Sequence, residues 1–200
     1  KAFLYLGVAL FKMDMFGQAQ KAFLRAHDIH RNDAQLQYNL GLCYFKQKQY
    51  SKAIEHLKFC TEIEPNHPYA FNNLAYIYNL HQYYQETLNL CNFAKQKLGK
   101  LYCTKLNEQR RKRGTQNKQV KMLQDVDDEF LHNVHAHWAF AHFKKGDMGK
   151  AIKKIQIGAL VSPHSPDVWI IWGLILKTVG NYKLARGKFM KALEVDPGNQ

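Results

Sequence analysis

The chain has 200 residues, 46% of them hydrophobic and 22% charged, a composition typical of a folded protein and not of a disordered one. Its formal net charge is +13. No signal peptide is visible, and the longest apolar run, 168–176, is far shorter than the ~20 residues that cross a bilayer, so nothing in the sequence points to a membrane.

Apolar residues recur along the chain with the spacing i, i+3, i+4 and i+7, as in Phe3, Leu6 and Leu10. This spacing is typical of amphipathic helices. No strand is predicted. In chain order, the pattern predicts helices over 1–13, 16–30, 34–47, 50–63, 68–81, 84–98, 131–145, 148–161, 166–179 and 182–195.

Small residues and prolines repeat at a fixed interval of 34 residues. Such a period indicates stacked helix-turn-helix repeats. A glycine in a helix interior costs about 1 kcal/mol relative to alanine, so its recurrence indicates that two helices approach closely there. The pairs that show the period are Gly7 and Gly41, Ala19 and Ala53, Ala151 and Ala185, Gly146 and Gly180, and Pro163 and Pro197.

The repeated positions resemble the tetratricopeptide repeat, whose pattern is Trp-x2-Leu-Gly-x2-Tyr, then Ala-x3-Phe, then Pro. The second copy has Leu40, Gly41, Tyr44, Ala53 and Pro65, and the fifth has Trp169, Gly173, Ala185, Phe189 and Pro197. The resemblance implies an all-α, right-handed superhelical solenoid. We expect three units over 1–99, an insertion over 100–130 and two units over 131–200, in a fragment of a longer chain.

Two Pro-x-x-Pro sequences resemble SH3 ligands, but their prolines are better explained as residues that mark helix boundaries. Pro65 and Pro163 are expected to end one helix, and Pro68 and Pro166 to be the first residue of the next, where proline is well tolerated. Ser165 would then be the N-cap residue.

The cysteines lack the short spacing of zinc or redox motifs. Cys43, Cys60 and Cys91 are expected on buried helix faces, where a thiol packs as a small apolar group in a reducing compartment. Cys103 lies in the insertion.

Four histidines crowd one predicted helix: His132, His135, His137 and His142. His132 and His135 share a face with Asp128, which would suit a metal. However, His135 and His142 take the places where the repeat packs Trp and Tyr, so a structural role is favoured. The chain lacks a phosphate loop and a nucleophile elbow. We therefore expect no enzyme activity, catalytic residue, cofactor or metal site.

The repeat register shifts by 30 residues at the insertion, roughly 100–129. Residues 100–121 contain eight cations against Glu108 alone, a net charge of +7. The stripe Leu98, Tyr102 and Leu106 predicts that the preceding helix continues to about Lys112, followed by an exposed turn at 114–117. The acidic run 125–129 suits the start of the next helix.

The basic sequence Arg110, Arg111, Lys112 and Arg113 has several interpretations. It could be a solvated loop, a nuclear-import signal, a nucleic-acid contact, or a contact to an acidic protein surface such as tubulin. Nucleic acid is disfavoured because no stacking aromatic residues lie among the basic ones.

In tetratricopeptide proteins the first helices line a concave groove that holds peptides or helices. Carried over to this chain, the resemblance places Phe11 and Phe45 there. The carboxylate clamp of some family members is largely missing, since Leu4 and Val8 take the first Lys and Asn places and only Asn39 fits. The candidate partner-binding residues are Tyr38, Asn39, Leu42, Tyr69, Asn72, Asn73, Tyr76, Asn79, Phe140 and Phe143.

We therefore predict a non-enzymatic scaffold in a larger eukaryotic assembly, binding a helical or extended partner segment. The expected location is cytoplasmic, with cytoskeletal, ciliary and nuclear placement open. Two alternatives remain: a nucleic-acid-binding repeat protein that uses the basic insertion, and a regulatory or targeting domain of a larger enzyme.

Overall fold

The computed structural model describes residues 1–65, 67, 69–96 and 134–198. They form two compact units, Lys1–Ile77 (unit 1) and Tyr78–Gln200 (unit 2). The described residues are helical, with turns between the helices and no strand. This all-α architecture is the one that the sequence predicts.

The observed helices match the predicted ones to within two residues wherever the ends lie among the described residues. Unit 1 contains α1 (Ala2–Lys12), α2 (Phe16–Ile29), α3 (Ala34–Lys46), α4 (Tyr50–Ile63) and most of α5 (Ala70–Leu80). Unit 2 contains the end of α5, a helix over 84–96, α8 (Val134–Lys144), α9 (Met148–Val161), α10 (Pro166–Thr178) and α11 (Tyr182–Val195).

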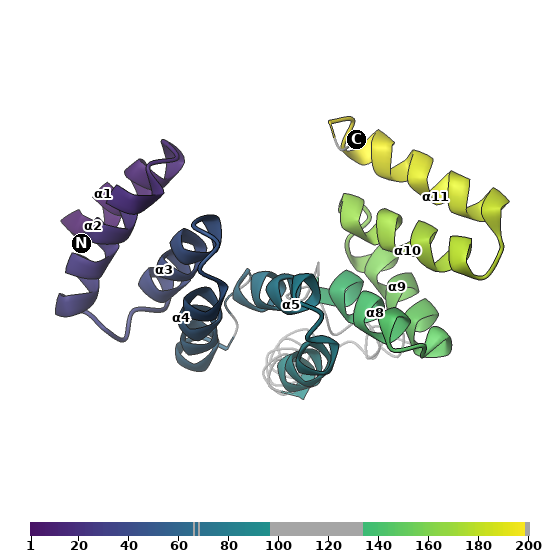
Figure 1. The fold of residues 1–200 in the computed structure, drawn as a ribbon, viewed down its shortest axis with the longest axis horizontal. Coiled ribbons are helices and arrows are strands. Elements are labelled where there is room, and N and C mark those ends of the chain that lie inside the picture. Colours follow the sequence, from purple (N-terminus) through teal and green to yellow (C-terminus); the bar gives the residue numbers. More distant parts are fainter. Residues whose placement is uncertain (66, 68, 97–133, 199–200) are drawn as a thin grey trace, which may run out of the picture. The chain divides into compact units, whose positions relative to one another are not determined.

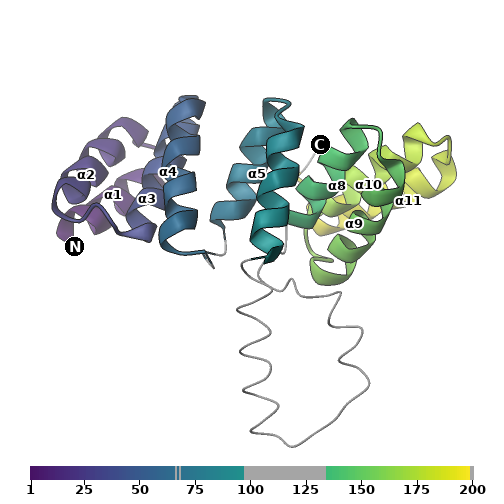
Figure 2. The same cartoon turned by 90° about the horizontal axis from the view of Figure 1, so that it is seen from below.

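Consecutive helices pack as antiparallel pairs within each unit (Figures 1 and 2). In unit 1, α1 packs against α2, α3 against α4, and α2 against α3. In unit 2 the same relation holds for α8 and α9, α9 and α10, and α10 and α11. In each unit a first helix thus packs on the second helix of the preceding pair, α3 on α2 and α10 on α9, which is how helical repeats build a continuous core.

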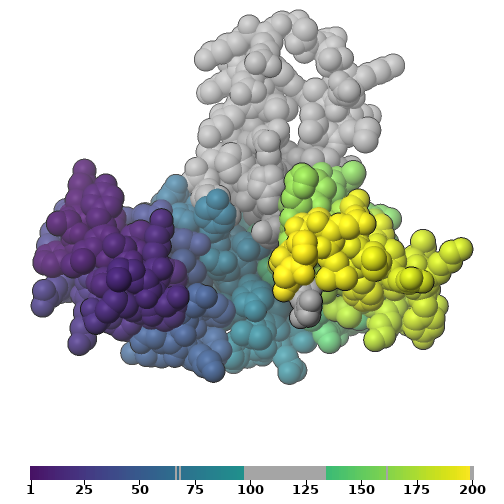
Figure 3. All heavy atoms as spheres, turned by 90° about the horizontal axis from the view of Figure 1, so that it is seen from above, coloured from purple at the N-terminus to yellow at the C-terminus, as the bar shows by residue number. Residues whose placement is uncertain are grey.

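The glycines of the first helices lie where two helices meet. A Cβ atom at Gly41 would lie 2.8 Å from Leu57 Cγ, and one at Gly173 would lie 2.5 Å from Phe189 Cε1. Ala19 and Ala53 on the second helices are fully buried. The predicted close approach is confirmed. Figure 3 shows the atoms of α1 and α2 as one closely packed purple group.

Each helix pair is joined by a turn with one residue in the left-handed conformation. These residues are Asp14, Lys48, Gln82, Gly146 and Gly180, with φ between 57° and 82°. Each turn closes with hydrogen bonds of the Schellman type, such as Gln49 N to Tyr44 O at 2.8 Å and Lys48 N to Phe45 O at 2.9 Å. The intervals between the five residues are 34, 34, 64 and 34, so the turn chemistry follows the repeat period on both sides of residues 97–133.

Two helix boundaries lie at prolines, as the sequence predicts. α10 begins at Pro166 with Ser165 as its N-cap residue, as predicted, although the Ser165 side chain makes no capping hydrogen bond. α4 ends at Ile63, ahead of Pro65. α5 spans Ala70–Leu80, with a hydrogen bond from Asn73 N to Tyr69 O in its first turn, and the predicted start at residue 68 lies outside the described residues.

The predictions for the insertion fall outside the described residues. They comprise the helix extension to Lys112, the turn at 114–117, Arg110–Arg113, the acidic run at 125–129 and Cys103. The domain limits therefore stay predictions. Among the residues that are described, none of the helices has the length and apolar character to cross a membrane.

Candidate partner-binding site

Unit 1 contains a pocket of about 250 Å³ between the first helices of its repeats. α1 contributes one lining residue, α3 four and α5 three. The lining residues are Phe11, Tyr38, Leu42, Phe45, Lys46, Asn73, Tyr76 and Ile77. Four of the ten residues predicted to bind a partner are therefore brought together here: Tyr38, Leu42, Asn73 and Tyr76.

Helical spacing explains why these side chains share one pocket. Tyr38, Leu42 and Phe45 lie at i, i+4 and i+7 on α3, which places them on one face of that helix. On α5, Asn73 and Tyr76 are three residues apart and project from one face in the same way. The pocket residues of α3 and α5 are thus held by regular helices and not by loops.

The polar and aromatic contacts in the pocket hold its wall in place. Asn73 Nδ2 donates a hydrogen bond of 3.0 Å to the Tyr38 hydroxyl oxygen. The rings of Phe45 and Tyr76 meet edge to face, with centroids 5.9 Å apart. Burial raises the pKa of Tyr38, outweighing the opposite effect of the Asn73 hydrogen bond, so the hydroxyl is neutral at physiological pH.

The helices around the pocket carry only positive charge. α1, α3 and α5 contain no aspartate or glutamate, and α1 and α3 each end in lysine, Lys12 and Lys46. Lys46 lines the pocket and is exposed. Its ammonium group lies 6.0 Å from the centroid of the Phe16 ring, within range of a cation–π contact.

Residues 34–67 match the tetratricopeptide repeat family profile. The chain has the tetratricopeptide-repeat fold. A structure of MamA (AMB-1) is 18% identical with a TM-score of 0.64, covering 99% of both chains. MamA from Desulfovibrio magneticus RS-1 is 13% identical with a TM-score of 0.67, covering 100% of this chain and 96% of that one.

YrrB, a TPR protein with an unusual peptide-binding site, is 12% identical with a TM-score of 0.62 and covers 98% of this chain and 86% of its own. No curated protein shows significant sequence similarity to the chain. These identities are low, so the likeness concerns the fold. The pocket lies on first helices of this tetratricopeptide solenoid.

Three further predicted residues of unit 1 lie outside the pocket lining. Tyr69 is 62% exposed, and its ring centroid is 6.4 Å from that of Tyr38. Asn39 and Asn72 are partly buried, and the Asn39 Nδ2 and Asn72 Oδ1 atoms are enclosed without a hydrogen-bond partner. Of these three residues, Tyr69 alone is exposed, and it lies beside the pocket residue Tyr38.

Asn79 differs from the prediction, because its amide is used inside unit 2. Its Nδ2 donates to the His137 carbonyl at 3.0 Å, and its Oδ1 accepts from Thr87 Oγ1 at 2.9 Å. The residue is only 8% exposed. It links α5 to the helix over 84–96 and to α8, and a partner has little access to it.

Phe140 and Phe143 of unit 2 are partly buried and pack against the core of α8, α9 and α10. The Phe140 ring lies 6.2 Å from Tyr84 and 6.4 Å from Phe143. The ammonium group of Lys144 lies over both phenylalanine rings, at 5.3 and 5.8 Å. These two phenylalanines therefore have a packing role, and any partner contact of theirs stays a prediction.

The histidines of α8 lie at packing positions. His135 is 1% exposed and stacks on Trp138 with ring centroids 5.8 Å apart. Burial lowers the pKa of His137 to about 4, against the opposing effect of Asp167. Within the described part of the chain, no group of three His, Cys, Asp or Glu residues is arranged to hold a metal; His132 and Asp128 lie outside it.

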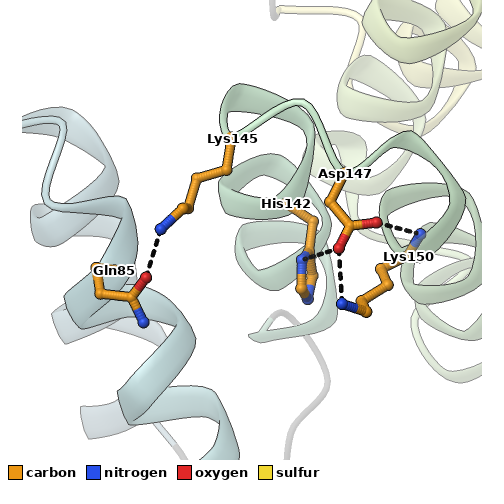
Figure 4. A network of polar contacts seen from close by, with 5 residues as sticks. All are labelled: Gln85, His142, Lys145, Asp147 and Lys150. Carbon is orange, nitrogen blue, oxygen red and sulfur yellow. Dashed lines mark hydrogen bonds and ion pairs between the residues drawn. The ribbon is translucent and has the colours of Figure 1, made fainter.

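His142 belongs to a polar network at the turn after α8 (Figure 4). Asp147 Oδ2 lies 3.7 Å from His142 Nδ1 and 2.8 Å from Lys150 Nζ. The lysine holds the pKa of Asp147 below its usual value, whereas burial lowers that of His142. At the same turn, Lys145 donates a separate hydrogen bond to Gln85 on the helix over 84–96.

Cys43, Cys60 and Cys91 are fully buried, as the sequence predicts. Burial raises the pKa of the Cys43 and Cys60 thiols to about 12. These two thiols are therefore protonated and unreactive at neutral pH, since the thiolate is the nucleophile and metal ligand.

Sequence reasoning missed Lys46 and Ile77 as pocket residues. The signal was available for Lys46, which follows Tyr38 by eight residues and Leu42 by four, and so continues their stripe on α3. Ile77 is 1% exposed and reads from the sequence as an ordinary core residue.

Proposed function

We propose that the chain is a non-enzymatic scaffold that holds a segment of a partner protein on the first helices of unit 1. The pocket of α1, α3 and α5 would anchor that segment. The observation that carries the proposal is the assembly of Tyr38, Leu42, Asn73 and Tyr76 around one apolar cavity.

General properties of the fold support the proposal that a partner segment binds on the first helices. Stacked helical repeats form extended concave binding surfaces from their first helices. Ligand pockets of proteins are mostly apolar hollows with a few well-placed polar groups, and this pocket has that composition. YrrB, which shares the fold, is reported with a peptide-binding site.

The biological setting belongs to the proposal as well. The eukaryotic, cytoplasmic, cytoskeletal or ciliary assembly expected from the sequence stays a prediction, since one of the similar structures is from Desulfovibrio magneticus. Arg110–Arg113 as a second contact, to an acidic protein surface, also stays a prediction.

Site-specific photo-crosslinking in the native complex tests the proposal. A photoreactive amino acid in place of Leu42, in the pocket, should capture a discrete partner. The same amino acid in place of Glu62, an exposed residue of α4, is the matched control and should capture none. Capture from position 62 and none from position 42 would move the contact to the second helices and overturn the proposal.

A further inference from the structure

We infer that the partner segment is an extended, internal stretch of acidic polypeptide that inserts one bulky apolar side chain into the pocket of unit 1. This inference rests on the proposed function and specifies the chemistry of its partner. It does not require a free carboxyl terminus on the partner.

The size and lining of the pocket indicate which kind of partner side chain can enter it. Six of its eight lining residues are aromatic or aliphatic. Its volume of about 250 Å³ falls below the ~300–1,000 Å³ of sites for drug-sized ligands. A cavity of this kind suits one large apolar side chain, such as leucine, methionine or phenylalanine.

The hydrogen-bonding groups of the pocket favour an extended partner over a helical one. The Tyr38 hydroxyl accepts from Asn73 Nδ2, which leaves its own hydrogen available as a donor. The Asn73 Oδ1 atom has no hydrogen-bond partner among the described residues and is an available acceptor. An extended backbone offers the matching C=O and N–H groups, whereas a helix uses them internally.

The charge around the pocket selects acidic flanking residues. Lys46 is the charged residue of the lining, and α1, α3 and α5 have no carboxylate to neutralise it. A carboxylate beside the anchor residue would complement Lys46, and a basic residue there would be repelled. Nucleic acid fits less well, because proteins follow its backbone with rows of cations and this pocket offers one.

This pocket lacks the residues that hold a terminal carboxylate in the clamp of some tetratricopeptide proteins. Leu4 and Val8 stand where a carboxylate clamp would need Lys and Asn, and the remaining clamp residue, Asn39, has its amide nitrogen enclosed. We therefore expect the acidic groups that bind at this pocket to be side chains.

Titration with short synthetic peptides, followed by NMR chemical shifts of the whole chain, tests the inference. The reference peptide has a central leucine between aspartates in a glycine–serine background, with both ends blocked. Four control peptides each differ from it in one respect. They have a central alanine, lysines in place of the aspartates, a helix-forming alanine-rich background, or a free carboxyl terminus. A single-stranded oligouridine is the competing ligand.

The reference peptide should shift the signals of Tyr38 and Tyr76 and bind about tenfold or more tightly than the alanine peptide, as expected for burying one leucine side chain. Freeing the carboxyl terminus should leave its affinity unchanged. Lys46→Glu should reverse the preference between aspartate and lysine flanks. Lys21→Glu, an exposed change on α2, is the matched control and should preserve it.

Both lysines are exposed, so neither variant endangers the fold. Equal binding of aspartate- and lysine-flanked peptides, tighter binding of the helix-forming peptide, displacement by oligouridine, or no shifts at the pocket would each overturn the inference. If any of these occurs while a partner is still captured from position 42, the inference fails and the proposed function stands. If no partner is captured from position 42, both the inference and the proposed function are overturned.

Discussion

The close approach of α3 and α4 predicts opposite effects for two identical glycine-to-alanine changes. At Gly41, a new Cβ atom would lie 2.8 Å from Leu57 Cγ, 3.0 Å from Leu57 Cδ2 and 3.4 Å from the Ala53 carbonyl oxygen. Leu57 is fully buried, so it has no free space into which it could turn. At Gly187, in the interior of α11, nothing lies within 4 Å.

The expected magnitudes follow from packing and helix propensity. Overpacking a tight contact costs about 1–3 kcal/mol, and alanine in place of glycine in a helix gains about 1 kcal/mol. Gly41→Ala should therefore lower the free energy of unfolding by about 1 kcal/mol. Gly187→Ala should raise it by about 1 kcal/mol, so that the two variants differ by roughly 2 kcal/mol.

Urea unfolding followed by far-ultraviolet circular dichroism measures the difference. Repeat proteins can unfold in parts, so tyrosine and tryptophan fluorescence should be recorded on the same samples. The three tryptophans lie in unit 2 and none lies in unit 1. If Gly41→Ala stabilised the protein as much as Gly187→Ala, the helices would not be in contact at Gly41 and the reasoning would be refuted.

Three further predictions concern the turns, the buried histidine and the insertion. Lys48 has φ of 60°, a conformation that costs a non-glycine residue about 1–2 kcal/mol, so Lys48→Gly should raise the free energy of unfolding in urea by up to about 1 kcal/mol. Gly180→Lys, the reverse change at φ 80°, should lower it. A change of the same sign in both variants would contradict the argument. His137 has its pKa lowered to about 4 by burial, so the unfolded chain binds a proton at this residue more readily than the folded chain does. The stability from this residue is complete above pH 6.5 and is lost as the pH falls towards 4, by up to about 3 kcal/mol. His137→Phe should therefore flatten the fall of the urea midpoint with pH, and the fall that remains comes from His56, His67 and His142, whose pKa values burial also lowers. Removing residues 100–129 should keep the contacts of Asn79 with His137 and of Tyr84 with Phe140, because both join described residues on either side of the segment. Circular dichroism checks this: a loss of helical signal beyond that of the deleted residues would show that the rest of the fold depends on the segment.

The sequence by itself determined the helices and their pairing. Each helix carries its own apolar spacing, and the small residues at Gly41 and Ala53 mark where helices must touch, so local periodicity was sufficient. The predicted start of the fifth helix at residue 68 lies outside the described residues and stays a prediction.

Only the tertiary structure decided which candidate residues lie together in one pocket. Tyr38 and Asn73 are 35 residues apart and meet through a hydrogen bond, while Asn79, on the same helix as Asn73, is turned into unit 2 by Thr87 and the His137 carbonyl. In sequence both are polar residues on one predicted helix. Burial and partners separate them, because a first helix faces open space on one side and its neighbouring helices on the others.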